Sequence, residues 1–129
     1  MRSADRVGVM LRKADGDDFA VKILLPIPES PEDIIGFHAQ QAVEIIKAVL
    51  TSASIHYRRT HDLLELMDLL WKGGLPFPEE LDQVDRLTPF AAEFRYDPMP
   101  EEPEQPFDRE WAADCVRKTK VWAAAILGQ

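Results

Sequence analysis

The chain has 129 residues, of which 46% are hydrophobic and 29% are charged, the size and composition of a single globular domain. Its net charge of −8 repels phosphate backbones before contact, so we expect no general binding of DNA. The single cysteine, Cys115, cannot form a disulfide within the chain. No apolar stretch follows the first residues as in a signal peptide, and the longest late apolar run, residues 121–127, is far shorter than the ~20 residues of a membrane span. We therefore expect a cytoplasmic protein that does not enter a membrane.

Apolar residues recur at spacings of three and four along most of the chain, which predicts an all-α protein. The first predicted helix covers about residues 3–25 and ends at Pro26. The second covers about residues 31–52, with Ser30 as its N-cap and Pro31 at its first position. This second helix has apolar residues on two faces and a narrow polar edge. Such a helix is either central or shared with a second subunit, so we expect a homodimer.

A third long helix is predicted to begin at an N-cap, Thr60, and to end at Gly73 and Gly74. Its apolar spacing predicts that the following side chains face the core: Leu63, Leu64, Met67, Leu70 and Trp71.

Two short helices are predicted next, one after Pro78 and one that begins at Thr88 and carries Phe90 and Phe94. Four prolines and four acidic residues over 97–106 predict an extended surface loop. The last helix is predicted over about residues 107–127, with Gly128 after it. Its apolar stripe consists of Trp111, Cys115, Thr119, Trp122 and Ile126. Three long helices and several short ones predict one domain over residues 1–129, an up-and-down bundle of four or five helices.

The sequence lacks the common motifs of metal and nucleotide sites. His38, His56 and His61 have neither the HExxH spacing nor a second cysteine, and no P-loop or GxGxxG occurs. We expect no metal and no cofactor. Cys115 lies at core spacing, where a small buried side chain is a better interpretation than a reactive thiol.

Gln41, Glu44 and Lys47 recur every three residues on the otherwise apolar second helix. They are either a solvated helix edge or a set of polar groups that holds a ligand or a partner. Because a small bundle offers few places for such an edge, we expect these three side chains to lie near His61 and Arg95.

Two further polar features lie later in the chain. Arg58 and Arg59 precede a helix N-terminus that also carries His61, an arrangement that suits phosphate binding but also an exposed helix start. Arg95 and Tyr96 stand immediately before the proline-rich loop.

Three segments together resemble HEPN domains, helical proteins often encoded beside a minimal nucleotidyltransferase. They are HAQQAVEIIKAVL, RRTHDLLELMDLL and FRYDP. The stretch ADGDDFA is similar to the first helix of that family, with Asp17 as the match to its usual aspartate. The resemblance covers most of residues 10–127.

This resemblance implies a helical bundle, a symmetric homodimer and a role beside a nucleotidyltransferase partner in a two-component, toxin–antitoxin-like system. A nucleotide near the subunit interface is a candidate ligand. The residues expected to bind the ligand or the partner are Asp17, Gln41, Glu44, Lys47, His61, Arg95 and Tyr96.

Some HEPN proteins are ribonuclease toxins, and these carry an arginine followed, after four to six intervening residues, by a histidine. Arg95 is followed at that spacing by Pro100, Glu101 and Glu102. The leading hypothesis is therefore a non-catalytic HEPN interaction module without catalytic residues.

The alternative is a divergent, metal-independent ribonuclease in which His61 acts with Arg58, Arg59 or Arg95. Arginines that converge on His61 in a basic cleft favour the nuclease. Charges that are paired one by one favour the interaction module.

Overall fold

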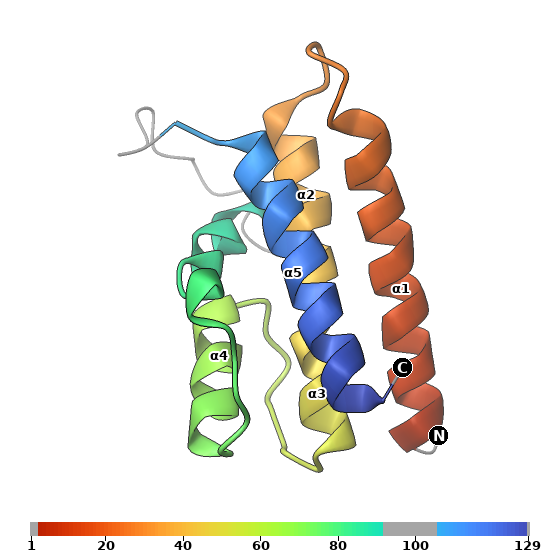
Figure 1. Cartoon of the computed structure of the whole chain (residues 1–129), viewed down its shortest axis with the longest axis vertical. Coiled ribbons are helices and arrows are strands. Elements are labelled where there is room, and N and C mark those ends of the chain that lie inside the picture. Colours follow the sequence, from red (N-terminus) through yellow and green to blue (C-terminus); the bar gives the residue numbers. More distant parts are fainter. Residues whose placement is uncertain (1–2, 92–105, 129) are drawn as a thin grey trace.

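The computed structural model describes residues 3–91 and 106–128 (Figure 1). Its elements are α1 (Ser3–Leu24), α2 (Glu32–Val43), α3 (Ile46–Ser52), α4 (Leu63–Lys72), η1 (Glu79–Leu81), η2 (Val84–Phe90) and α5 (Arg109–Leu127). Every regular element in these two ranges is helical, so the all-α prediction is confirmed. None of the helices described is long and apolar enough to cross a membrane.

The helices α2 and α3 form the centre of the bundle. They contact α1, α5, α4 and η2, and Figure 1 shows α1 on one side of them and α4 with the 3₁₀ helices on the other. Their fully buried side chains include Ile35, Ala39, Val43, Ile46, Val49 and Leu50. Both apolar faces of the predicted second helix are thus covered within one chain, apart from Ile34 at its start, which is 36% exposed. The argument for a homodimer from a surplus face on residues 31–52 is therefore wrong.

The single helix predicted over residues 31–52 is two helices. At Glu44 and Ile45 the backbone tightens, with ψ values of 0° and −18°. The amides of Lys47 and Ala48 donate to the carbonyls three residues earlier, at 2.8 and 2.9 Å. This 3₁₀-like turn separates α2 from α3 without any glycine or proline.

Two predicted N-caps are wrong, because each hydroxyl bonds elsewhere. Ser30 Oγ donates to the carbonyls of Leu24 and Ile27, and Pro31 takes the cap position of α2. Thr60 Oγ1 accepts from the amide of Asp62, and it is the Asp62 carboxylate that caps α4. A carboxylate also interacts favourably with the helix dipole at this end.

The inward orientation predicted for Trp71 and Leu64 is wrong. Trp71 is 80% exposed and Leu64 is 56% exposed. Within α4, the fully buried side chains are Leu63, Leu66 and Leu70, because this helix packs on the bundle through one narrow face.

The helix predicted to begin at Thr88 is also wrong, since Thr88 and Pro89 lie near the end of η2. The hydroxyl of Thr88 accepts from the amide of Leu63 at 3.2 Å, so it serves the start of α4. Phe94 and residues 97–105 lie outside the described residues.

Several other predictions are confirmed. Gly73 follows the last residue of α4, η1 follows Pro78, and Gly128 ends α5 with a φ of 73°. Cys115 is buried, and burial raises the pKa of its thiol to about 12, as expected for a core side chain.

One long-range contact fixes the start of α5. The guanidinium of Arg109 donates to the carbonyls of Ile27 and Ser30, both at 2.9 Å, and to the Ser30 hydroxyl at 3.0 Å. It therefore ties α5 to the connection between α1 and α2.

Candidate functional site: a polar network at the α2–α3 turn

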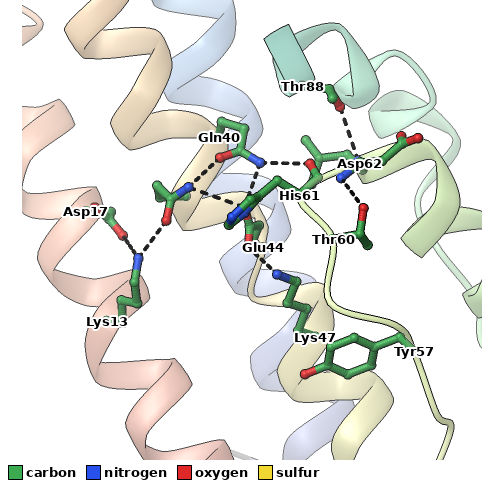
Figure 2. Close-up of polar contacts among 12 residues, drawn as sticks. Lys13, Asp17, Gln40, Glu44, Lys47, Tyr57, Thr60, His61, Asp62 and Thr88 are labelled. Atoms are coloured by element: carbon green, nitrogen blue, oxygen red, sulfur yellow. Dashed lines mark hydrogen bonds and ion pairs between the residues drawn. The ribbon is translucent and has the colours of Figure 1, made fainter. Parts of the chain in front are cut away.

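The carboxylate of Glu44 accepts hydrogen bonds from four side chains (Figure 2). Its Oε2 atom lies 2.7 Å from Nε2 of Gln40, 2.6 Å from Nδ1 of His61 and 3.3 Å from Nε2 of Gln41. Its Oε1 atom accepts from Nζ of Lys47 at 2.6 Å. The Glu44 side chain is only 10% exposed, so these bonds replace most of its hydration.

Local backbone geometry brings three of these groups together. Gln40 precedes Glu44 by about one helical turn, and Lys47 follows it across the 3₁₀-like turn. Segment 53–62 then returns along α3 and brings His61 to the carboxylate (Figure 1). The fully buried amide of Gln40 also donates to the His61 carbonyl at 3.1 Å, so Gln40 holds both the carboxylate and the incoming segment.

The network continues to α1 through Gln41. Nζ of Lys13 donates to Oε1 of Gln41 at 2.8 Å and lies 3.4 Å from the carboxylate of Asp17. His38 contacts the other oxygen of Asp17 at 3.0 Å. We call this set the Glu44 network: Lys13, Asp17, His38, Gln40, Gln41, Glu44, Lys47 and His61.

Five residues singled out from the sequence lie in this network: Asp17, Gln41, Glu44, Lys47 and His61. Their role in binding stays a prediction. Arg95 and Tyr96 lie outside the described residues, so their expected place beside the network is not described.

The two other candidate cations, Arg58 and Arg59, lie at the surface. Nε of Arg58 lies 2.9 Å from both oxygens of Glu65, on an arginine side chain that is 69% exposed. Arg59 is exposed. The guanidinium of Arg58 is thus engaged at the surface, beside α4.

Sequence reasoning missed three members. Gln40 had a usable signal, since it stands one helical turn before Glu44 on the same polar edge. The spacing of Lys13 and Asp17 indicates a pair within α1 but not its link to α2. Nothing local in the sequence indicates that His38 reaches Asp17.

The geometry defines the chemistry of His61. A carboxylate only accepts, so the imidazole donates its Nδ1 proton to Glu44 and presents Nε2 as an acceptor when the ring is neutral. The His61 side chain is 31% exposed, which leaves this edge within reach of a ligand. Among the residues that the structure describes, no cluster of three or more histidine, cysteine or acidic side chains could hold a metal ion.

A second charged network joins α1 to α5. Nζ of Lys120 lies 2.9 Å from carboxylate oxygens of both Asp15 and Asp18, and Lys22 pairs with Asp18 at 3.0 Å. Burial alone would raise the pKa of Asp18, but hydrogen bonds from Lys120 and Lys22 outweigh it and hold that pKa below its ordinary value. We call these four residues the Lys120 network.

An all-helical bundle with a buried polar network at its centre is the class of protein that these features define. Comparison with known families matches residues 9–123 to the HEPN domain. The chain therefore belongs to the HEPN domain family, and the resemblance of its motifs is confirmed. The comparisons with curated proteins and with solved structures give no match.

Proposed function

We propose that this chain is a non-catalytic HEPN interaction module. In this proposal it forms a homodimer and acts with a nucleotidyltransferase-domain partner in a two-component, toxin–antitoxin-like system, with a nucleotide near the subunit interface as the candidate ligand. The observation that carries the proposal is the pairing of charges around His61. Lys47 and His61 both bond Glu44, while Arg58 bonds Glu65 at the surface.

Electrostatics support the non-catalytic role. A ribonuclease must gather the scissile phosphate with cations beside its proton-transfer groups. Here the nearest charge to Nδ1 of His61 is a carboxylate oxygen 2.6 Å away, and the same carboxylate engages Lys47. A phosphate at this position would meet the negative charge of Glu44.

The homodimer is supported by a groove between α1 and α5. It has a volume of about 570 Å³ and an apolar floor that includes Val21, Ala113 and Ala124. Val121 lines it and is 63% exposed, and its rim carries charges of both signs. A surface with both signs suits an isologous contact, in which the same patch meets itself.

Sedimentation velocity at micromolar concentration tests the homodimer. We expect a dimer for the wild type, a monomer for Val121→Glu, and a dimer for Leu64→Glu, which changes an exposed leucine on α4 as a matched control. A 14.7 kDa species for the wild type at every concentration would contradict this part of the proposal.

The partner is tested by co-expression with a minimal nucleotidyltransferase encoded beside this chain. We expect the two proteins to elute together from a sizing column in a fixed stoichiometry. Separate elution at micromolar concentration would count against the two-component role.

One observation favours the alternative, a metal-independent ribonuclease. A histidine whose Nδ1 is held by a carboxylate is the arrangement of a general base, and His61 with Glu44 has it. In this alternative His61 transfers protons and Arg58, Arg59 or Arg95 binds phosphate.

Cleavage of single-stranded RNA separates the two functions. We expect the wild type to cleave no faster than His61→Ala, whereas a general base contributes about 10²–10⁴-fold in rate. Faster cleavage by the wild type, with equal Tm for both proteins, would establish the nuclease instead.

A further inference from the structure

A separate polar cavity lies at the end of α3. Its volume is about 370 Å³, and its lining is Arg6, Thr51, Ser54, Ile55, His56 and Tyr57. It shares no residue with the Glu44 network. It lies beyond Lys47 along α3, where Figure 2 shows Tyr57 on the segment that returns to His61.

The lining of this cavity is rich in hydrogen-bond donors. It offers a guanidinium, an imidazole and the hydroxyls of Thr51, Ser54 and Tyr57, and among residues 3–91 and 106–128 no carboxylate lines it. The hydroxyl oxygens of Thr51 and Tyr57 are 3.4 Å apart, a long contact that leaves both groups free to meet a stronger acceptor.

Arg6 differs from most cations of this acidic chain. Among the residues that the structure describes, the cations that form ion pairs with carboxylates are Lys13, Lys22, Lys47, Arg58, Lys72, Arg117, Lys118 and Lys120. Arg6, like Arg12 and Arg59, forms no ion pair within that part of the chain, and of these three only Arg6 lines this cavity. Its charge is therefore available to an anion.

Ser54 occupies a backbone position that favours glycine. Its φ is 60°, and the amide of Ile55 reaches back to the carbonyl of Leu50 at 2.9 Å, the bond that closes a helix in the Schellman motif. A serine in this conformation lowers the stability of the fold relative to a glycine, but it places a hydroxyl on the cavity wall.

We propose that this cavity binds the phosphate group of a small phosphomonoester. The guanidinium fork of Arg6 supplies charge-assisted hydrogen bonds, and His56 with the three hydroxyls supplies further donors to a tetrahedral anion. The volume exceeds what a phosphate ion needs, which leaves room for an attached organic group. This site does not depend on the homodimer or on a nucleotidyltransferase partner.

Titration of the full chain with inorganic phosphate, followed by amide NMR at constant ionic strength, tests the site. We expect the perturbed amides to centre on Arg6 and residues 51–57. Arg6→Ala is expected to weaken phosphate binding at least tenfold, and Arg12→Ala, an exposed arginine on the same helix, is expected to leave it within twofold. Equal loss in both variants, or no perturbation at millimolar phosphate, would overturn the proposal.

Binding of ribose 5-phosphate and of ribose shows whether the cavity recognises a phosphomonoester or only free inorganic phosphate. A phosphomonoester site binds ribose 5-phosphate more tightly than inorganic phosphate and does not bind ribose. Tighter binding of inorganic phosphate than of ribose 5-phosphate would overturn the assignment to a phosphomonoester.

Ser54→Gly separates binding from folding. Because glycine adopts this φ without strain, we expect the Tm to rise by about 2–4 °C while phosphate affinity falls threefold or more. A raised Tm with unchanged affinity would contradict the role of the Ser54 hydroxyl.

Discussion

In the Glu44 network and in the Lys120 network, one central charged group bonds several partners, but the two networks differ in burial. Glu44 is 10% exposed and one of its partners, Gln40, is fully buried. Lys120 is 27% exposed and one of its two carboxylate partners, Asp15, is 67% exposed. The first network replaces hydration in the interior, whereas the second remains partly in water at Lys120 and Asp15, although its Asp18 is only 9% exposed.

The two networks therefore have different roles: the first positions a side chain, and the second holds two helices together. Around Glu44 the hydrogen bonds fix the place and the tautomer of His61, which arrives from a segment 17 residues later in the chain. Around Lys120 the ion pairs only connect α5 with α1. We therefore expect loss of a charge to cost far more in the first network.

The largest effect is expected for Glu44→Ala. Removing one partner of a buried charged pair destabilises a protein by about 3–5 kcal/mol. In Glu44→Ala the fully buried amide of Gln40 and the partly buried Lys47 and His61 all lose their acceptor. Urea unfolding followed by circular dichroism gives the free energy of unfolding.

Glu65→Ala is the matched control. It removes an ion pair with Arg58 at the surface, where such pairs contribute about 0–1 kcal/mol. Equal losses for Glu44→Ala and Glu65→Ala would mean that burial does not distinguish these carboxylates, and the comparison between the two networks would fail.

Much of the fold could be predicted because helical periodicity is local. Apolar spacing of three and four, with prolines and glycines at the ends, places the long helices within a few residues of the observed bounds. The break at Glu44 and Ile45 could not be predicted in this way. Its neighbours in sequence favour a helix, while the acceptor role of Glu44 depends on His61, which comes from elsewhere in the chain.

The exposure of Trp71 is a second feature that local periodicity does not predict. Its spacing from Leu64 and Met67 fits an apolar helix face, but which face meets the core depends on where η2 and α3 lie. For the site, the recurrence of Gln41, Glu44 and Lys47 every three residues was informative. The contributions of Lys13 and His38 depend on how α1 packs on α2, which one sequence does not specify.

A smaller effect is expected for Lys120→Ala. Its pair with Asp15 is largely solvated, and Asp18, although only 9% exposed, keeps its ion pair with Lys22, so we expect a loss of about 1 kcal/mol or less in the free energy of unfolding. Lys120→Met keeps the apolar stem and removes the charge, so it separates packing from electrostatics. A loss as large as that of Glu44→Ala would show that the α1–α5 ion pairs contribute as much to stability as the Glu44 network.

The smallest effect is the acid dependence of Asp18. Burial opposes its charged form, but Lys120 and Lys22 outweigh this, and the folded pKa lies below the ordinary value of 3.8. A depressed pKa stabilises the folded state above pH 3.8, and this contribution is lost as the pH falls through the folded pKa. The difference in unfolding free energy between wild type and Asp18→Asn should therefore shrink as the pH falls below about 4.

Measured in the Lys120→Ala background, the same difference should be smaller at neutral pH, because one of the two cations that stabilise the carboxylate is gone. An unchanged difference there would mean that Lys22 alone sets the ionisation of Asp18, and that Lys120 ties α5 to α1 through Asp15.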